Sequence, residues 1–212
     1  MNIIKHRVNT IEELKNVNHE YGIEVDVRYH NNEIILHHDP FNHHNSNPEI
    51  LEDLIKEFKI NHKGIIILNI KTEGIEMECI KLMNKYKIKS WFFLDLSMPY
   101  FCLYANKAYK REIEGFSPEN FAVRFSEYEP IEYALAFKDK ASWVWVDCFT
   151  KMPLNEKSYK QLKDANFKIC LVAPELQKHS IQKTFLFQEV LKQDDIKIDA
   201  VCTKNANLWI NL

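Results

Sequence analysis

The sequence predicts an α/β protein, a single (β/α)8 TIM barrel, and three observations lead to this prediction. Apolar strand-like runs alternate with helical patterns along the chain, which favours a parallel sheet. Eight main strand-like runs fit within 212 residues, and an α/β barrel of about 200–250 residues can form one domain. No linker, internal repeat or low-complexity segment interrupts the chain, so residues 1–212 are expected to form one domain. A doubly wound open sheet is the alternative, which the glycine-free first strand–helix connection disfavours.

The expected strands are recognised by the spacing of their apolar residues. Gly22–Tyr29 follows a strict two-residue period, and Gly64–Ile70 is a β-branched run typical of a buried strand. Between them, Glu33–His37 forms an additional short extended run. The eight main strands are expected at Asn2–Lys5, Gly22–Tyr29, Gly64–Ile70, Ser90–Leu96, Asn120–Phe125, Ser142–Asp147, Lys168–Ala173 and Ile198–Thr203.

Two of the expected helices begin at clear capping signals. Thr10 and Glu13 form a capping box, in which each side chain accepts a hydrogen bond from a backbone N–H of the first turn. Asn47 and Pro48 are expected to open a helix that runs to about Phe58, with asparagine as the cap and proline in the first helical position. The other helices are expected at Ile75–Tyr86, Pro99–Ala105, Pro130–Phe137, Glu156–Ala165 and Ile181–Lys192, before a short tail over Asn205–Leu212.

The glycine content excludes two ways of binding phosphate. The chain has only 4 glycines, whereas average usage of about 7% predicts roughly fifteen. No two of them make a G-x-G, so a Rossmann fingerprint and a P-loop are both excluded. If the protein binds phosphate, side chains or a metal ion must do so.

Charge and hydropathy exclude further classes of partner. A net charge of −2 gives no general attraction to nucleic acid or to an anionic membrane. No apolar run approaches the about 18 residues of a membrane span, and the N-terminus lacks the apolar segment of a signal peptide. The 5 cysteines are odd in number and widely spaced, which favours reduced thiols in a cytoplasmic protein.

Charged side chains at the expected strand ends form the candidate site. In a barrel, active residues lie at the carboxyl ends of the strands. A two-residue period places Glu24, Asp26 and Arg28 on one face, pointing inward, where ions are costly unless paired or bound to metal. Carboxylate oxygens of a Glu-x-Asp pair suit a hard cation such as Mg²⁺ or Ca²⁺.

Histidines and cations complete this arrangement. His6 and His38 follow neighbouring strand ends and suit acid–base chemistry near neutral pH. The combination indicates metal-assisted phosphoryl transfer, and a mutually satisfied polar plug is the alternative for any one residue. Arg124 either contacts phosphate or pairs with Glu127 or Glu129. The cations expected to attract an anion are Arg28, Lys71, Arg124 and Lys204.

The motifs that contain these residues resemble those of a known family. His6-Arg7, then Glu24-Val25-Asp26-Val27-Arg28, then His38-Asp39-Pro40 resemble the H-R, E-x-D-V-R and H-D-P signature of glycerophosphodiester phosphodiesterases. That family belongs to the phosphatidylinositol phospholipase C-like phosphodiesterase barrels. The motifs cover roughly residues 3–71, and the last expected strand is similar to the family's last strand.

The resemblance implies a role for each residue. His6 and His38 would be the general acid and base, and Arg7 and Lys71 would contact the phosphate. Glu24 and Asp26 would bind a divalent cation, Mg²⁺ or Ca²⁺. The family's third metal ligand is usually a glutamate at the position of Asn69, which keeps a carbonyl oxygen but lacks the charge. The implied substrate is a small phosphodiester or a phosphosugar-like molecule.

The departures from the family pattern leave two alternatives open. The first loop, Arg7-Val8-Asn9-Thr10, is shortened and is similar to that of sphingomyelinase D-like enzymes, which implies a phosphodiester lyase as one alternative. Asn69 and the short loop also suit a barrel that binds a phosphorylated ligand without turnover. The polar segment His37–Asn47 is expected to be the long loop beside the pocket, and its paired histidines lack the spacing of a structural zinc site.

Overall fold

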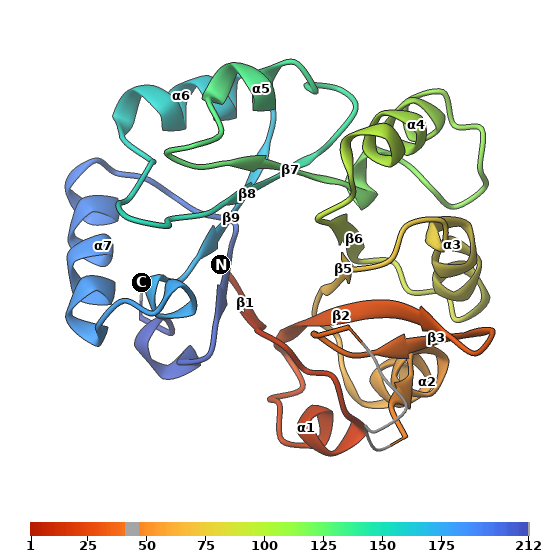
Figure 1. Ribbon diagram of the computed structural model, residues 1–212. Coiled ribbons are helices and arrows are strands. Elements are labelled where there is room, and N and C mark those ends of the chain that lie inside the picture. The colour runs from red at the N-terminus through yellow and green to blue at the C-terminus, as the bar shows by residue number, and fades with distance from the viewer. Residues whose placement is uncertain (41–46, 212) are drawn as a thin grey trace. The chain divides into compact units, whose positions relative to one another are not determined.

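Strands and helices alternate along the chain in a computed structural model, which describes residues 1–40 and 47–211 (Figure 1). Two compact units are distinguished, one of residues Lys5–Asn120 and one of Met1–Ile4 with Phe121–Leu212. Of the expected loop His37–Asn47, His43 and His44 lie outside the described residues.

The unit Lys5–Asn120 contains a mixed sheet and its covering helices. Its elements are α1 (Ile11–Lys15), β2 (Gly22–His30), β3 (Glu33–Leu36), β4 (Glu49–Ile50), α2 (Leu51–Asn61), β5 (Ile66–Ile70), α3 (Glu76–Lys85), β6 (Trp91–Leu94), α4 (Met98–Tyr109) and the 3-10 helix η1 (Pro118–Asn120). Strand β5 pairs in parallel with both β2 and β6, and the register sets Asp26 opposite Asn69. Strand β3 pairs antiparallel with β2, and β4 with β3.

The other unit is built on parallel strands in sequence order. Its elements are β1 (Asn2–Lys5, shared at Lys5 with the first unit), β7 (Ala122–Phe125), α5 (Ile131–Leu135), β8 (Trp143–Val146), α6 (Glu156–Asp164), β9 (Lys168–Val172), the 3-10 helix η2 (Pro174–Gln177), α7 (Ile181–Gln193), β10 (Ala200–Thr203) and the 3-10 helix η3 (Ala206–Leu208). Strand β8 lies between β7 and β9, and β10 pairs with β9. The backbone N–H of Asn2 donates to the carbonyl of Asp199 at 2.8 Å.

The eight main strands predicted from the sequence are present as β1, β2 and β5 to β10. The capping box at Thr10 and Glu13 is confirmed, with the backbone N–H of Glu13 donating to Oγ1 of Thr10 at 3.1 Å. The predicted helix start at Asn47-Pro48 is wrong, because Glu49 and its neighbour pair with β3 as a short strand and α2 begins only at Leu51. Pairing of this segment with β3 outweighs the local capping signal.

Burial along β2 sets the position of the candidate site. Ile23, Val25 and Val27 are fully buried on one face of this strand, while Glu24 and Asp26 are each only 1% exposed on the other. Two carboxylates are therefore kept away from water by the same strand that supplies the apolar core. None of the described helices is long and apolar enough to cross a membrane. All five cysteines are free thiols.

Candidate active site

The carboxylate of Glu24 lies in a closed set of donors. Its Oε1 accepts a hydrogen bond from Nδ2 of Asn69 at 2.8 Å, and its Oε2 accepts one from the backbone N–H of Arg7 at 2.8 Å. Nε2 of His6 is 3.8 Å from the same Oε2. Burial, and then the neighbouring Asp26 carboxylate, raise the pKa of Glu24 to about 7, although the hydrogen bonds from Asn69 and Arg7 oppose this.

The carboxylate of Asp26 is held at one oxygen and left open at the other. Asn9 clamps this residue twice: its Nδ2 donates to Oδ2 of Asp26 at 2.9 Å, and its Oδ1 accepts the backbone N–H of Asp26 at 2.8 Å. Nε of Arg7 is 3.8 Å from Oδ2. The other oxygen, Oδ1, is buried without a hydrogen-bond partner, and its nearest cation is Nζ of Lys71 at 3.7 Å.

Lys71 and Asn69 form the other side of the site, at the carboxyl end of β5. Nζ of Lys71 donates to Oδ1 of Asn69 at 2.7 Å and lies 3.4 Å from Oδ2 of Asp95. Asn69 therefore directs its amide nitrogen to Glu24 and its carbonyl oxygen to Lys71. The predicted third metal ligand thus bridges a carboxylate and an ammonium group.

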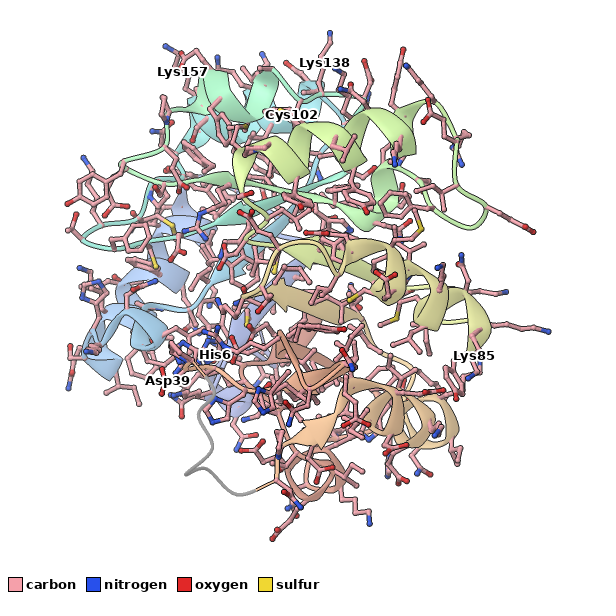
Figure 2. The ribbon with its side chains drawn as sticks, turned by 45° about the vertical axis from the view of Figure 1, so that its right-hand side comes forward. His6, Asp39, Lys85, Cys102, Lys138 and Lys157 are labelled. Carbon is pink, nitrogen blue, oxygen red and sulfur yellow. The ribbon has the colours of Figure 1, made fainter. Side chains whose placement is uncertain are left out.

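His38 is fixed through both ring nitrogens. Nδ1 of His38 is hydrogen bonded to Oδ1 of Asp39 at 2.8 Å, and Nη2 of Arg7 contacts Nε2. The hydrogen bond with His38 holds the pKa of the Asp39 carboxyl below its ordinary value. Because the Arg7 guanidinium can only donate, the arrangement suits a neutral ring with its proton on Nδ1 and its lone pair on Nε2. His6 and Asp39 are labelled in Figure 2.

Arg28 directs its guanidinium group at backbone carbonyls. Nη2 donates to the carbonyl of His38 at 2.8 Å, Nε donates to the carbonyl of His37 at 3.1 Å, and Nη1 reaches the carbonyl of Lys71 at 3.4 Å. The side chain thus connects the backbone that carries His38 with the backbone that carries Lys71. In this arrangement its donors serve the protein backbone.

Arg124 belongs to the other unit, where two carboxylates hold it. Its Nε donates to Oε1 of Glu129 at 2.7 Å, and its Nη2 donates to Oδ2 of Asp147 at 2.9 Å. Of the alternatives that the sequence left open for Arg124, the structure contains the pairing with Glu129, and sequence reasoning missed its contact with Asp147. The two-residue period that places Trp143, Trp145 and Asp147 on one face was the available signal for this contact.

The structure brings eight of the nine predicted site residues into one unit, and it adds Asn9 and Asp39. Sequence reasoning gave Asn9 no part in the site, because the residue reads as part of a helix start. Its position directly before the capping box was the available signal, since that box fixes the backbone that aims its side chain at Asp26. The eight residues are His6, Arg7, Glu24, Asp26, Arg28, His38, Asn69 and Lys71.

The donor set can be tested for its fit to a divalent cation. Across residues 1–40 and 47–211, no three His, Cys, Asp or Glu side chains form a metal-binding group. Glu24 and Asp26 nevertheless offer buried carboxylate oxygens, and Oδ1 of Asp26 has no hydrogen-bond partner. Hard cations prefer such oxygens, and a cation there would offset the repulsion between the Glu24 and Asp26 carboxylates. The chemistry of these two carboxylates fits Mg²⁺ or Ca²⁺.

Comparisons with known proteins show which other proteins share this fold. No protein-family model and no curated protein sequence matches this chain. Among solved structures, a Galdieria sulphuraria protein assigned as a glycerophosphodiester phosphodiesterase is similar with a TM-score of 0.70 and 16% identity, covering 99% of this chain and 96% of that one.

Two bacterial structures support the same similarity. A glycerophosphodiester phosphodiesterase from Agrobacterium tumefaciens has a TM-score of 0.65 and 11% identity, covering 99% of each chain. One from Parabacteroides distasonis has a TM-score of 0.61 and 13% identity, covering 97% of this chain and 93% of that one. The alternation of strands and helices therefore predicted the fold class correctly, and this chain has the α/β fold of the glycerophosphodiester phosphodiesterases, which are TIM barrels.

Proposed function

We propose that this protein is a phosphodiesterase that cleaves a small phosphodiester by histidine acid–base catalysis, assisted by a divalent cation. The observation that supports the proposal most is the joining of Glu24, Asp26, His38 and Lys71 through Arg7 and Asn69 in one unit. The same fold in solved glycerophosphodiester phosphodiesterases supports the reaction class.

The two histidines take different roles in this proposal. His38 is the general base, because its Nδ1 is bound to Asp39 and its Nε2 lone pair is freed to accept a proton when Arg7 turns from it to the phosphate. It accepts the proton of the substrate hydroxyl beside the phosphodiester as that oxygen bonds to phosphorus. His6 is the general acid, and it protonates the alcohol oxygen whose bond to phosphorus breaks, which leaves a cyclic phosphate. Water then opens the cyclic phosphate to a phosphomonoester, with the acid and base roles of the two histidines exchanged.

The cations divide into those that face the substrate and those that support the site. Arg7 and Lys71 bind the phosphate oxygens, since charged donors make the strongest hydrogen bonds to phosphate. Arg28 supports the backbone of His38 and Lys71 instead. Glu24 and Asp26 would hold the divalent cation, with Oδ1 of Asn69 as the third ligand, and a bound ion would supply charge neutralisation and polarise a phosphoryl oxygen.

A second candidate function rests on Asn69. Because its amide nitrogen satisfies Glu24 and its oxygen satisfies Lys71, part of the site is already neutral and hydrogen bonded. Such a site suits a barrel that binds a phosphorylated ligand without cleaving it. The lyase alternative uses the same histidines and differs only in releasing a cyclic phosphate.

One assay separates the three possibilities. Purified protein is incubated with Mg²⁺ or Ca²⁺ and with glycerophosphocholine or lysophosphatidylcholine, and the products are identified by ³¹P NMR. A phosphomonoester supports the hydrolase, a stable cyclic phosphate identifies the lyase, and binding of these compounds without any product identifies the binding protein.

Variants of the histidines test the mechanism. His6→Ala and His38→Ala are each expected to lower kcat by about 10²- to 10⁴-fold, the usual contribution of general acid–base catalysis. The matched control is His30→Ala, at the end of strand β2. Equal activity of the His38→Ala variant and the control would contradict the proposed mechanism.

A further inference from the structure

A cleft of about 400 Å³ lies at the amino ends of β5 and β6, in the unit Lys5–Asn120. One wall comes from the end of α2 and the segment that follows it, and the other from the segment between α3 and β6. Four of the side chains that line it are lysines, namely Lys59, Lys63, Lys87 and Lys89. The volume falls within the range of about 300–1,000 Å³ found for small-molecule sites.

The positive charge of this lysine cleft is largely uncompensated. Lys63 pairs with Glu20 at 3.0 Å, whereas within the described chain Lys59, Lys87 and Lys89 have no carboxylate partner within ion-pair distance. The segment Cys79–Leu94, which supplies one wall, contains no Asp or Glu at all. The net charge of the chain is nevertheless −2, so the cations here are a local concentration.

Concave surfaces lined by one sign of charge concentrate the field and attract ions of the opposite sign. Two segments far apart in sequence bring these lysines together, although their mutual repulsion opposes it. From this arrangement we propose that the lysine cleft is a binding site for a phosphate-bearing small molecule. Lys87 and Lys89 also line an adjacent cleft of about 620 Å³, but Glu114 and Glu119 line that cleft too, so the lysine cleft is the one suited to an anion.

This site is separate from the candidate active site and does not depend on its chemistry. Gly64, which precedes β5, lines the lysine cleft, whereas Lys71 follows the other end of the same strand. A strand rises about 3.3 Å per residue, so the five residues of β5 place about 16 Å between the two ends. A ligand in the cleft is therefore a second ligand, bound at a distance from the reacting groups.

Calorimetric titration of the full chain with sodium pyrophosphate tests the site. The variant Lys87→Gln/Lys89→Gln is expected to bind pyrophosphate about tenfold more weakly, equivalent to about 1.4 kcal/mol. The matched control Lys138→Gln/Lys157→Gln removes two exposed lysines elsewhere, both labelled in Figure 2. A further variant, Lys71→Gln, separates the cleft from the candidate active site.

A second experiment distinguishes a soluble phosphate ligand from a lipid headgroup. The protein is sedimented with phosphatidylcholine vesicles that contain or lack phosphatidic acid. Binding of pyrophosphate alone supports a soluble ligand, and binding to the phosphatidic acid vesicles that is lost in Lys87→Gln/Lys89→Gln supports a lipid headgroup. The proposal is overturned if the wild-type chain binds neither probe. It is equally overturned if Lys87→Gln/Lys89→Gln binds like the control, or if Lys71→Gln alone abolishes binding.

Discussion

The Asp26 carboxylate in one unit and the Asp147 carboxylate in the other are both buried at strand ends beside arginines, but their hydrogen bonding differs. Asp147 accepts from four donors: Gln177 at 2.7 Å, Arg124 at 2.9 Å, the backbone N–H of Cys148 at 3.1 Å and Nε1 of Trp145 at 3.4 Å. Asp26 accepts at Oδ2 only, and its Oδ1 is left without a hydrogen-bond donor.

This difference indicates that the Asp147 carboxylate supports the fold, whereas the Asp26 carboxylate has one oxygen available for a ligand. Removing a buried charge that is fully paired and hydrogen bonded leaves its partners unsatisfied and destabilises the fold. A buried charge with an open oxygen, next to another carboxylate, is costly to the native state. Such a cost is typical of sites arranged for a ligand or a reaction.

The largest expected effect comes from the same substitution at both positions. Both oxygens of Asp147 accept hydrogen bonds, so in Asp147→Asn the new NH2 group faces another donor whichever way the amide is turned. The free energy of unfolding is therefore expected to fall by about 3 kcal/mol. In Asp26→Asn the amide group can take the place of the open Oδ1 and relieve the repulsion with Glu24, so stability is expected to stay within about 1 kcal/mol of wild type. Urea unfolding measures both, and equal losses would remove the distinction.

The next largest effect concerns Arg28 and is measured with a substrate that the protein cleaves. Because one ammonium group cannot reach the three carbonyls that the guanidinium contacts, Arg28→Lys and Arg28→Gln are both expected to lower kcat about tenfold with little change in KM. A phosphate-binding Arg28 would instead show a raised KM and substantial rescue by lysine. The exposed Arg111→Gln serves as the control.

A smaller effect is expected from restoring a third carboxylate beside Asp26. Asn69→Glu replaces the amide that satisfies Glu24 with a further oxygen donor. Mg²⁺ affinity measured by calorimetry is expected to rise about tenfold, or about 1.4 kcal/mol, while the metal-free protein loses stability because three carboxylates then repel one another. The exposed Asn106→Glu should leave the Mg²⁺ affinity unchanged.

The smallest effect is expected at Glu76, a third buried carboxylate to set beside Asp26 and Asp147, which is 0% exposed. Its Oε2 accepts from the backbone N–H of Gly74 at 3.0 Å, but Oε1 has no hydrogen-bond partner. Burial raises the pKa of Glu76 above the ordinary carboxyl value. The folded state therefore holds a proton that the unfolded state releases, and stability falls as pH rises from the ordinary pKa through the raised one.

Glu76→Gln removes this pH dependence. Its free energy of unfolding is expected to exceed that of wild type by about 1 kcal/mol above the raised pKa, with no difference below the ordinary carboxyl pKa. Urea unfolding at acidic and at neutral pH provides the measurement, and the exposed Glu78→Gln on the same helix is the control. A constant difference at both pH values would indicate a packing effect rather than a titration.

Local patterns predicted the elements well where the local signal was strong. The two-residue period of β2 located Glu24 and Asp26 on one face, and the capping box located α1, because both depend on residues adjacent in sequence. The start of α2 could not be predicted, since the pairing of Glu49 with Leu36 is decided by a strand thirteen residues earlier. Arg28 and Arg124 show the same limit. Their charge could be read from the sequence, but the backbone carbonyls that Arg28 contacts and the contact of Arg124 with Asp147 could not.

The sequence by itself determined the fold class, the strand that carries the carboxylate pair, and the residue types available for phosphate chemistry in a glycine-poor chain. The tertiary structure alone decided which donors each charged group received. Hydrogen bonds form only when donor and acceptor approach to within about 3.5 Å, and between segments distant in sequence such distances arise only when those segments pack together. That packing committed Arg28 to backbone carbonyls and Arg124 to two carboxylates, left one oxygen of Asp26 open, and gathered four lysines at the opposite end of β5.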